Sequence, residues 1–342
     1  MLKILELFGG IGACSKALER LGIDYKIADY VEIDKYAVKS FNAIHNTNFE
    51  PQDITQWDKD IEVDLIMHGS PCQDFSLAGK QAGGVKGSGT RSSLIYETIK
   101  IVEKLKPKYV IWENVKNSLN EPHIQVVNDY IEQLNKIGYV SNIKLTTASY
   151  YGIPQERQRV ICVSILNGEK FEFPEEKMKA NNLEDYIDFR KEDDLTFNFY
   201  RRYKKVVNNN ATIEEFENYI DNLPIKKGIG TKKMGLYTFG EMDTITMPSG
   251  RTGTLTCRNV QNYNKKFWYN KKLYKPSPKM CWLLMGFDEN DFIKASKVND
   301  DKALYNQAGN SIVVNVLEAI LDNLLIKPKI DEEIDKLLEK VD

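Results

Sequence analysis

The first 170 residues alternate between short apolar runs and stretches in which apolar residues recur every three or four positions. The runs predict buried strands, and the wider spacing predicts helices with one buried face. The predicted strands cover residues 3–8, 25–31, 63–68, 108–112 and 159–165, and the predicted helices cover 14–21, 37–44, 94–105 and 124–137. Strands that alternate with helices are typical of an α/β fold with a doubly wound, mainly parallel sheet.

This regular alternation ends near residue 171, and Asn, Lys and aromatic residues dominate up to about residue 274. We expect a smaller second domain with irregular strands in this region. A strong helical pattern returns at 313–324, and this helix is expected to pack back on the first sheet. We therefore predict one domain formed by residues 1–172 and 290–342 and a second formed by residues 173–289.

Composition places the chain among globular proteins and excludes several classes. Of its 342 residues, 42% are hydrophobic and 28% are charged, and no apolar run reaches the length of about 18 residues that a membrane span needs. The N-terminus carries no secretory signal pattern. Five cysteines without CxxC spacing indicate reduced thiols in the cytoplasm. Three histidines, none at metal-ligand spacing, argue against a histidine-based metal enzyme.

The net charge of −2 hides an uneven distribution. Residues 201–275 hold fifteen Lys and Arg against six Asp and Glu, a surplus of nine positive charges, so the remainder of the chain carries −11. A basic segment inside an acidic chain indicates contact with a polyanion. A lysine-rich solvated surface explains the same charges equally well.

Open α/β sheets bind ligands beyond the carboxyl ends of their strands, so the loops at these ends are the places to look for chemistry. The first is the glycine-rich loop Phe8–Gly12, and Glu32 follows twenty positions beyond Gly12 at the end of the next predicted strand. An acid at this point can accept both hydroxyls of a ribose. The pair fits a dinucleotide, S-adenosylmethionine or a tight turn without a ligand. Ser15 stands where GxGxxG requires its third glycine, which disfavours a nicotinamide-dependent oxidoreductase.

Cys72 follows a proline directly after the predicted strand 63–68. A thiol in such a loop is a candidate nucleophile, because the thiolate is the reactive form and positive neighbours favour it. Cys14, Cys162 and Cys281 instead sit in apolar patterns, and we interpret them as buried hydrophobic residues.

Three further polar motifs are candidates for function. Glu113 closes an apolar strand, where a carboxylate is costly unless it is paired or used. Arg157 and Arg159 alternate along a predicted strand, so both are expected to point to one face, and a surface ion-pair role is the alternative. Asn310 and Ser311 precede the last predicted helix, which they are expected to cap while also reaching a ligand.

In their order and spacing, these motifs resemble those of the cytosine-C5 DNA methyltransferases over nearly the whole chain. The matching motifs are the Phe-Gly-x-Gly loop at 8–12, Glu32, Asp53-Ile54, Pro71-Cys72-Gln73, Arg91–Leu94, Glu113-Asn114-Val115, Gln155-x-Arg157-x-Arg159 and Gln307-x-Gly309-Asn310-Ser311. The resemblance implies a Rossmann-like methyltransferase domain, and a target-recognition domain at 173–289. It also implies S-adenosylmethionine as cofactor with S-adenosylhomocysteine as product, double-stranded DNA as partner, and no metal.

The same resemblance implies a role for each motif. Cys72 would add to carbon 6 of a flipped cytosine, Glu113 would hold ring nitrogen 3 and the exocyclic amine, and Arg157 with Arg159 would hold the ring oxygen. The implied cofactor contacts are Phe8, Gly10, Ile11, Gly12, Glu32, Ile33, Asp53, Ile54, Pro71, Leu94, Asn310 and Ser311. The expected DNA contacts are Gln73, Ser76, Lys80, Arg91, Arg251, Thr254 and Arg258.

Two departures from the family pattern bear on local geometry. Ser277–Cys281 stands where Thr-Pro-Arg-Glu-Cys is usual, so an Arg–Glu pair that braces the small domain is missing or rebuilt. Gln52 precedes Asp53 where glycine is common, so the adenine side of the cofactor pocket is expected to differ slightly.

Two rival functions remain compatible with the same fold, namely a transfer-RNA cytosine methyltransferase and a catalytically silent DNA-binding homologue. The basic segment and Ser76 favour DNA, and the intact Cys72, Glu113 and Arg157 set argues for catalysis. We expect a monomer in the cytoplasm of a bacterium or a phage-infected cell.

Overall fold

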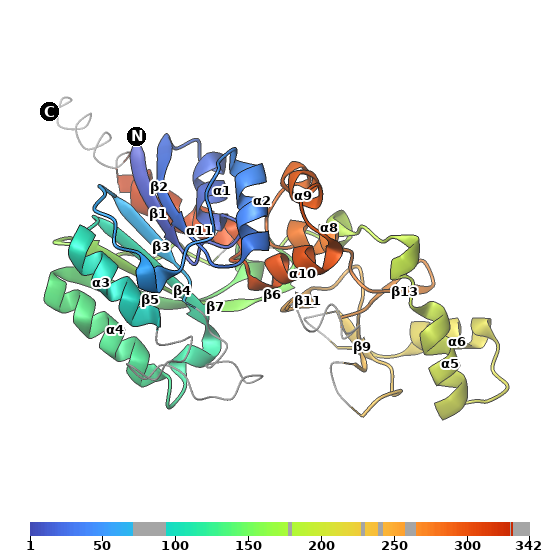
Figure 1. The fold of residues 1–342 in the computed structure, drawn as a ribbon. Helices are drawn as coiled ribbons and strands as arrows, with labels where there is room; N and C mark the ends of the chain where they lie inside the picture. Colours follow the sequence, from blue (N-terminus) through green and yellow to red (C-terminus); the bar gives the residue numbers. More distant parts are fainter. Residues whose placement is uncertain are drawn as a thin grey trace, which may run out of the picture. The chain divides into compact units, whose positions relative to one another are not determined.

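The computed structural model of the chain forms two compact units (Figure 1). The first unit comprises Met1–Thr147, Gln158–Lys177 and Ile312–Asp342, and the second comprises Ala148–Arg157 and Met178–Ser311. The sequence predicts residues 290–311 in the larger domain, whereas these contact-based units place them in the second. The residues that the structure describes are 1–70, 94–176, 180–226, 230–238, 242–256, 265–328 and 330.

A six-stranded sheet organises the first unit, and its strand order is β2-β1-β3-β4-β7-β5. The strands are β1 (Leu2–Leu7), β2 (Tyr25–Val31), β3 (Leu65–His68), β4 (Tyr109–Val115), β5 (Tyr139–Thr147) and β7 (Gln158–Leu166). The first four pair in parallel, whereas β7 runs antiparallel to both of its neighbours. The predicted α/β class with a mainly parallel sheet is confirmed.

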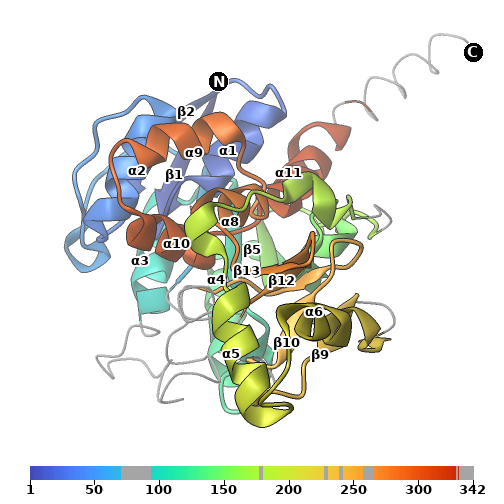
Figure 2. The same ribbon diagram turned by 90° about the vertical axis from the view of Figure 1, so that its right-hand side faces the viewer.

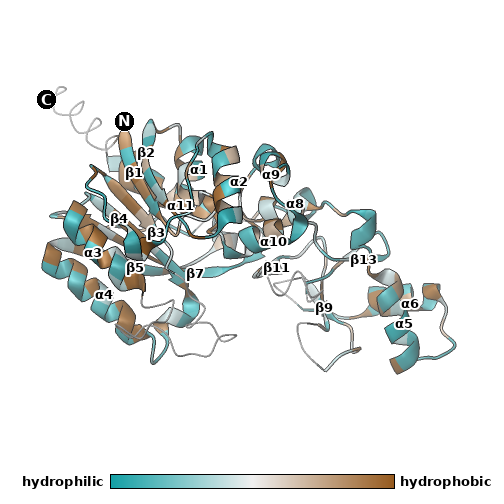
Figure 3. Cartoon of the chain, in the orientation of Figure 1, coloured by the Kyte–Doolittle hydropathy of each residue, from teal (hydrophilic) through white to brown (hydrophobic). Residues whose placement is uncertain are grey.

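Helices cover both faces of this sheet, with α1, α2 and α11 on one side and α3 and α4 on the other (Figure 1). Their bounds are α1 (Ala13–Arg20), α2 (Lys35–His45), α3 (Ile95–Leu105), α4 (Ile124–Ile137) and α11 (Val314–Leu325). The short turns of 3-10 helix are η1 (Ile54–Gln56) and η3 (Lys116–Leu119). Helix α11 packs against α1 within the first unit, the unit to which the last helical pattern is assigned. Figure 3 shows hydrophobic colouring along β3 and β4 in the middle of the sheet.

Two features of this sheet differ from the prediction. Strand β5 is absent from the sequence-based assignment because its sequence YVSNIKLTT mixes polar and apolar residues, as an edge strand with one partner allows. The prediction of a continuous strand through Arg157 and Arg159 is wrong. Arg157 lies between two separate strands, β6 (Gln155–Glu156) and β7. The period-2 rule therefore does not apply across the pair.

The second unit combines a small sheet with two groups of helices. Its strands are β8 (Ile225–Lys226), β9 (Thr231–Lys233), β10 (Thr244–Thr246), β12 (Phe267–Tyr269) and β13 (Lys272–Tyr274), with β11 (Thr252–Gly253) paired to β6. Its helices are α5 (Thr196–Val206), α6 (Ile213–Asn222), α8 (Pro278–Leu283), α9 (Glu289–Ser296) and α10 (Asp301–Asn310), with 3-10 turns η4 (Ala148–Tyr150), η5 (Leu183–Tyr186) and η6 (Lys191–Asp193). Figure 2 shows α5 and α6 beside β9 and β10, and one apolar core joins these elements.

The irregular strands expected in this region are present, but α5 and α6 were not expected. Helix α6 carries a sequence signal that identifies its start: Thr212 and Glu215 form a capping box, the pattern Ser/Thr-x-x-Glu.

Among the described residues no single helix has the length and apolar character of a membrane span, and the bent pair α10 and α11 meets that test only jointly, by length and composition.

Candidate active site

The loop between β1 and α1 turns sharply and is open on one side. Phe8, Gly10 and Gly12 have positive φ angles of 54°, 54° and 81°, a backbone region that glycine enters without steric cost. A Cβ atom at Gly12 would lie 2.3 Å from Nε2 of His45, so this position has no room for a side chain. At Gly10 a Cβ atom would meet nothing within 4 Å. The loop therefore presents open backbone at Gly10.

Two side chains of the β2 segment hold this loop. Tyr30 is fully buried, stacks on Phe41 with ring centroids 3.8 Å apart, and donates from Oη to the carbonyl of Gly10 at 2.6 Å. Glu32 accepts from the Gly10 N–H at 3.1 Å through Oε2 and from the Asp34 N–H at 2.9 Å through Oε1. Burial raises the pKa of Glu32. The predicted partners Glu32 and Gly10 are thus in direct contact.

The remaining cofactor candidates of the first unit have distinct environments. Ile11 and Ile54 are buried in the core, whereas Ile33 exposes 69% of its surface beside Glu32. Asp53 accepts from the Thr55 N–H at 2.9 Å and so caps η1. Leu94 is the residue before α3 and packs against the core.

Gln52, the departure from the family pattern, connects its own loop to β2. Its Nε2 donates to the carbonyl of Tyr30 at 2.7 Å and to Asp29 Oδ1 at 3.1 Å, and its N–H donates to the carbonyl of Glu32 at 2.8 Å. A glycine would supply only the last of these bonds. The glutamine side chain therefore fastens the loop that carries Asp53.

Glu113 and Arg159 form an ion pair at the carboxyl end of β4. Arg159 Nε lies 2.8 Å from Glu113 Oε1, and both side chains are largely buried, with exposures of 15% and 11%. The antiparallel register that pairs Val115 with Arg159 and Glu113 with Ile161 brings the two together. Arg159 also donates from Nη1 to the carbonyl of Gln158 at 2.8 Å. Two of the predicted catalytic residues are therefore adjacent.

Ser70, which the sequence analysis does not single out, joins β4 to the loop that leads to Cys72. Its Oγ accepts from Trp112 Nε1 at 3.3 Å and from Asn114 Nδ2 at 3.4 Å. All three side chains are buried. The sequence signal that could have identified Ser70 is its position directly before Pro71-Cys72. A hydroxyl that is buried there needs hydrogen-bond partners.

Arg157 lies in the second unit and is 2% exposed. Its Nη1 donates to the carbonyl of Leu255 at 2.8 Å, and its Nη2 donates to the carbonyls of Gly309 at 2.9 Å and Ser311 at 2.7 Å. A guanidinium that binds three carbonyls fixes the backbone around it. Arg157 and Arg159, expected to act together, thus have different partners in different units.

Asn310 and Ser311 end α10 and do not cap the last helix. Ser311 is the residue after α10, and the residue before α11 is Val313, without a side-chain cap. The predicted capping role is wrong because residues 312 and 313 separate the motif from α11. Both residues belong to the second unit, and their contact with a cofactor stays a prediction.

Among the expected DNA contacts, Arg251 and Thr254 both meet Glu156. Arg251 Nη1 lies 2.8 Å from Glu156 Oε1, and Thr254 Oγ1 donates to the Glu156 carbonyl at 3.0 Å. These contacts join β11 to β6 within the second unit. The other predicted site residues lie outside the described residues, and they are Pro71, Cys72, Gln73, Ser76, Lys80, Arg91 and Arg258.

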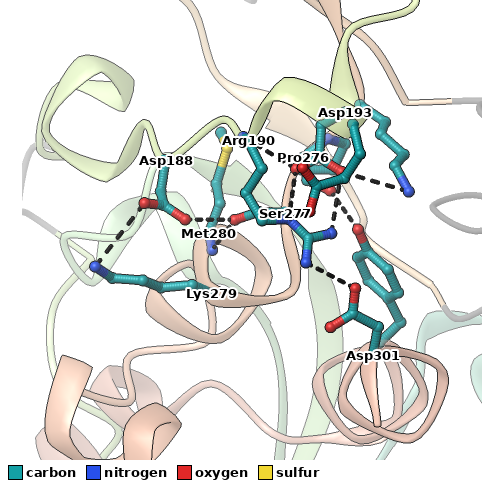
Figure 4. Close-up of polar contacts among 11 residues, drawn as sticks. Asp188, Arg190, Asp193, Pro276, Ser277, Lys279, Met280 and Asp301 are labelled. Atoms are coloured by element: carbon teal, nitrogen blue, oxygen red, sulfur yellow. Dashed lines mark hydrogen bonds and ion pairs between the residues drawn. The ribbon is translucent and has the colours of Figure 1, made fainter. Parts of the chain in front are cut away.

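The altered Ser277–Cys281 motif is embedded in a polar cluster of the second unit (Figure 4). Ser277 donates from Oγ to Asp188 at 2.7 Å and accepts from the Met280 N–H at 3.1 Å, so it caps α8. Lys279 Nζ meets Glu289 at 2.6 Å and Asp188 at 3.9 Å. Where the family has an Arg–Glu pair, this motif forms ion pairs through Lys279.

A second part of this cluster anchors the N-terminal end of α10. Arg190 bonds the fully buried Asp193 and reaches Asp301 from Nη1 at 2.7 Å (Figure 4). Lys275 Nζ lies 3.4 Å from Asp193. Ion pairs of residues outside the motif thus lie beside those of Lys279.

The three described cysteines are free and buried, as predicted. Burial raises the pKa of Cys162 to about 12, which keeps its thiol protonated at neutral pH. Among the described residues no group of three or more His, Cys, Asp or Glu side chains is arranged to hold a metal ion.

Comparison with known proteins finds relatives that match nearly the whole chain. The type II methyltransferase M2.ScrFI of Lactococcus lactis subsp. cremoris is 28% identical over 95% of this chain and 99% of its own length. The type II methyltransferase M.HhaI of Haemophilus parahaemolyticus is 30% identical over 94% of each chain. The structure of the Entamoeba histolytica methyltransferase EhMeth shares the fold with a TM-score of 0.67, at 18% identity over 95% of this chain and 98% of that one.

The sequence profile of the family described as C-5 cytosine-specific DNA methylase matches residues 2–325. The match runs from the first strand to the end of α11 and so includes both units. The chain therefore belongs to the C-5 cytosine-specific DNA methylases and is a DNA (cytosine-5-)-methyltransferase.

Proposed function

We propose that the enzyme methylates cytosine within a specific duplex DNA sequence through a covalent bond between Cys72 and carbon 6 of the base. Carbon 5 of cytosine is a weak nucleophile. Addition of the Cys72 thiolate to carbon 6 moves an electron pair towards carbon 5, which then attacks an electrophilic methyl group. Loss of the carbon 5 proton to solvent and expulsion of the Cys72 thiolate restore the aromatic ring, now methylated.

The observation that carries this proposal is the Glu113–Arg159 ion pair at 2.8 Å. Both side chains stand at the carboxyl edge of the sheet, where α/β enzymes bind substrates. We assign Glu113 to ring nitrogen 3 and the exocyclic amine, and Arg159 to the ring oxygen. A guanidinium that is already paired with the carboxylate orients it for the base and stabilises its charge.

Ser70 supports the position of the nucleophile relative to this pair. Its hydroxyl accepts from Trp112 and from Asn114, the residues on either side of Glu113. Cys72 lies two residues beyond Ser70 in the chain. These bonds hold Ser70 itself beside β4, and orientation of reacting groups contributes strongly to rate.

The residues at the ends of β1 and β2 fit S-adenosylmethionine. When bound, this cofactor supplies the electrophilic methyl group and becomes S-adenosylhomocysteine. A carboxylate offers about four acceptor positions, so Glu32 keeps capacity for ribose hydroxyls beside its bonds to Gly10 and Asp34. The exposed Ile33 offers an apolar surface for a flat ring, and Gly10 lets the ligand approach the backbone.

We further propose that the second unit recognises the DNA sequence and that the target base leaves the stack, at a cost of a few kcal/mol. The surplus of nine positive charges over residues 201–275 supports contact with DNA. We expect a monomer, and the bacterial relatives support the cytoplasm as its location.

A trapping experiment tests the mechanism. A duplex with 5-fluorocytosine at the target should form a covalent adduct with the wild type only when S-adenosylmethionine is present, because fluorine cannot leave as a proton does. Cys72→Ser should form no adduct and should not methylate, since a hydroxyl is far less ionised than a thiol near neutral pH. Binding of the duplex should persist in a mobility-shift assay.

Cys257→Ser serves as the matched control and should trap and methylate like the wild type. Peptide mapping should place the adduct on Cys72. An adduct on another cysteine, or full methylation by Cys72→Ser, would overturn the proposed mechanism.

A further inference from the structure

Arg202 on α5 is held in a fixed position by two groups of the second unit. Its Nε donates to the carbonyl of Leu236 at 3.2 Å, and its guanidinium carbon lies 4.9 Å from the centroid of the Tyr237 ring. Arg190 and Arg251 in the same unit direct Nη atoms at carboxylates. For the Nη atoms of Arg202, by contrast, the described part of the chain provides no hydrogen bond or ion pair.

The surface beneath Arg202 is rigid. The buried carboxylate of Asp243 accepts from three consecutive N–H groups, those of Gly235 at 3.0 Å, Leu236 at 2.8 Å and Tyr237 at 3.1 Å. The Tyr237 ring in turn packs edge-on against Phe199 of α5, with centroids 5.7 Å apart. Both groups that hold Arg202 are therefore themselves fixed, and stacking on an aromatic ring restricts the guanidinium further.

Such an arginine suits a planar, directional acceptor pair better than a phosphate. The guanine edge in the major groove presents two acceptors, N7 and O6, to which an arginine binds with two parallel hydrogen bonds. Phosphate contacts position a protein on DNA but carry no sequence information. The exposed Arg201 and Lys205 on the same helix can supply the positive charge for such contacts. The Arg201 guanidinium carbon lies 6.0 Å from the centroid of the Phe197 ring, at the outer limit of a cation–π contact.

We propose that Arg202 determines sequence specificity by reading one guanine of the recognition site in the major groove. This inference rests on the proposed role of the second unit in DNA recognition. The loop Gly235–Tyr237 and Asp243 act as positioning residues, because they hold Arg202 and leave its two Nη groups for the base.

The test compares Arg202→Ala with Arg201→Ala, its exposed neighbour on α5. Each full-length protein is given a library of duplexes in which the positions flanking the target cytosine vary, and methylation is read by bisulfite sequencing. The wild type should require guanine at one position. Arg202→Ala should lose about 5- to 150-fold of the preference for that guanine and keep its preferences elsewhere. Arg201→Ala should keep the full sequence preference.

A second pair of variants guards against misfolding. Tyr237→Phe keeps the ring under Arg202 and should retain the guanine preference, whereas Tyr237→Ala should relax it at the same position. Cofactor binding and melting temperature of each variant are measured in parallel. A uniform loss of methylation over all sequences in a folded Arg202→Ala protein would identify a phosphate contact and overturn the proposal, and so would an unchanged preference. Absence of methylation by the wild type would instead refute the activity itself.

Discussion

Glu32 is a half-buried carboxylate in a setting that disfavours its charge, since burial raises its pKa. Ribose hydroxyls donate most strongly to an ionised acceptor. We expect Glu32→Ala to weaken S-adenosylmethionine binding by about 1–3 kcal/mol, the range for hydrogen bonds to a charged group. The affinity of the wild type should also fall as the pH is lowered through the raised pKa, because protonation removes an acceptor. Calorimetry across pH measures both effects.

Glu50→Ala removes an exposed carboxylate from the same region and is the control. It should bind the cofactor like the wild type at every pH. Unchanged affinity in Glu32→Ala, or a pH dependence that survives in it, would contradict the assignment of Glu32 to the ribose.

Arg157 and Arg159 are two residues apart, yet their surroundings predict opposite effects of substitution. Arg157→Ala leaves three carbonyls, two of them in buried hydrogen bonds, without their charged donor and should lower the free energy of unfolding by about 2–5 kcal/mol. Arg159→Lys keeps a positive charge beside Glu113 but loses the guanidinium geometry, and it should lower kcat with a smaller change in stability. Denaturant titration and single-turnover methylation distinguish the two, and similar stability losses in both variants would contradict the division of roles.

Single residues differ in how well the sequence predicts them. The buried state of Cys14, Cys162 and Cys281 follows from their apolar neighbours, and the structure confirms it. The partners of Arg157 do not follow from any local pattern, because Leu255 and Ser311 are distant in the chain. The role of Ser70 is not predictable from its local sequence for a similar reason, because its hydrogen-bond donors come from β4.

The junction of β1 and α1 contains a carboxylate that makes stability depend on pH. Glu6 is 2% exposed and accepts from the N–H and the hydroxyl of Ser15 at the start of α1. Desolvation raises the pKa of Glu6 from 4.5 to about 7. Between these values the folded state holds a proton that the unfolded state releases. The stabilising contribution of Glu6 is therefore complete below pH 4.5 and is lost as the pH rises to about 7.

We expect Glu6→Gln to remove this dependence. Relative to the wild type, the variant should gain about 3 kcal/mol in the free energy of unfolding between pH 4.5 and pH 8, on an order-of-magnitude scale. Urea denaturation at several pH values measures the difference, so that groups common to both proteins cancel. Glu50→Gln, at an exposed position, should run parallel to the wild type. A constant gap between Glu6→Gln and the wild type over this range would show that Glu6 has an ordinary pKa.

Elements with strong periodicity are predicted well, and elements that depend on tertiary contacts are not. The helices α1, α2, α3 and α4 match their predicted positions, since each buries one face on the sheet. Strand β5 has a single partner strand, so its sequence needs no continuous apolar run. Helix α5 has few buried residues, among them Phe199 and Tyr203, and most of its other residues are polar. Its helical form therefore depends on the apolar core that it shares with α6.

Charge and chemistry are divided between different parts of this chain. The proposed nucleophile, the Glu113–Arg159 pair and the Glu32 loop come from segments of the first unit. The positive surplus of residues 201–275 belongs to the second. Because phosphate contacts release counterions, DNA binding that depends on this surplus weakens steeply with salt. Chemistry and sequence recognition should therefore be separable by exchange of segments.

Replacing residues 175–275 with the corresponding segment of a relative tests this separation. The hybrid should methylate carbon 5 of cytosine in the sequence recognised by the donor, because base chemistry stays with Cys72, Glu113 and Arg159 while the reading side chains change. Bisulfite sequencing of a plasmid from cells expressing the hybrid identifies the site. A hybrid that also carries Cys72→Ser is the control and should leave the plasmid unmethylated. An active hybrid that keeps the original recognition sequence would place specificity outside residues 175–275 and would remove the basis for assigning it to Arg202.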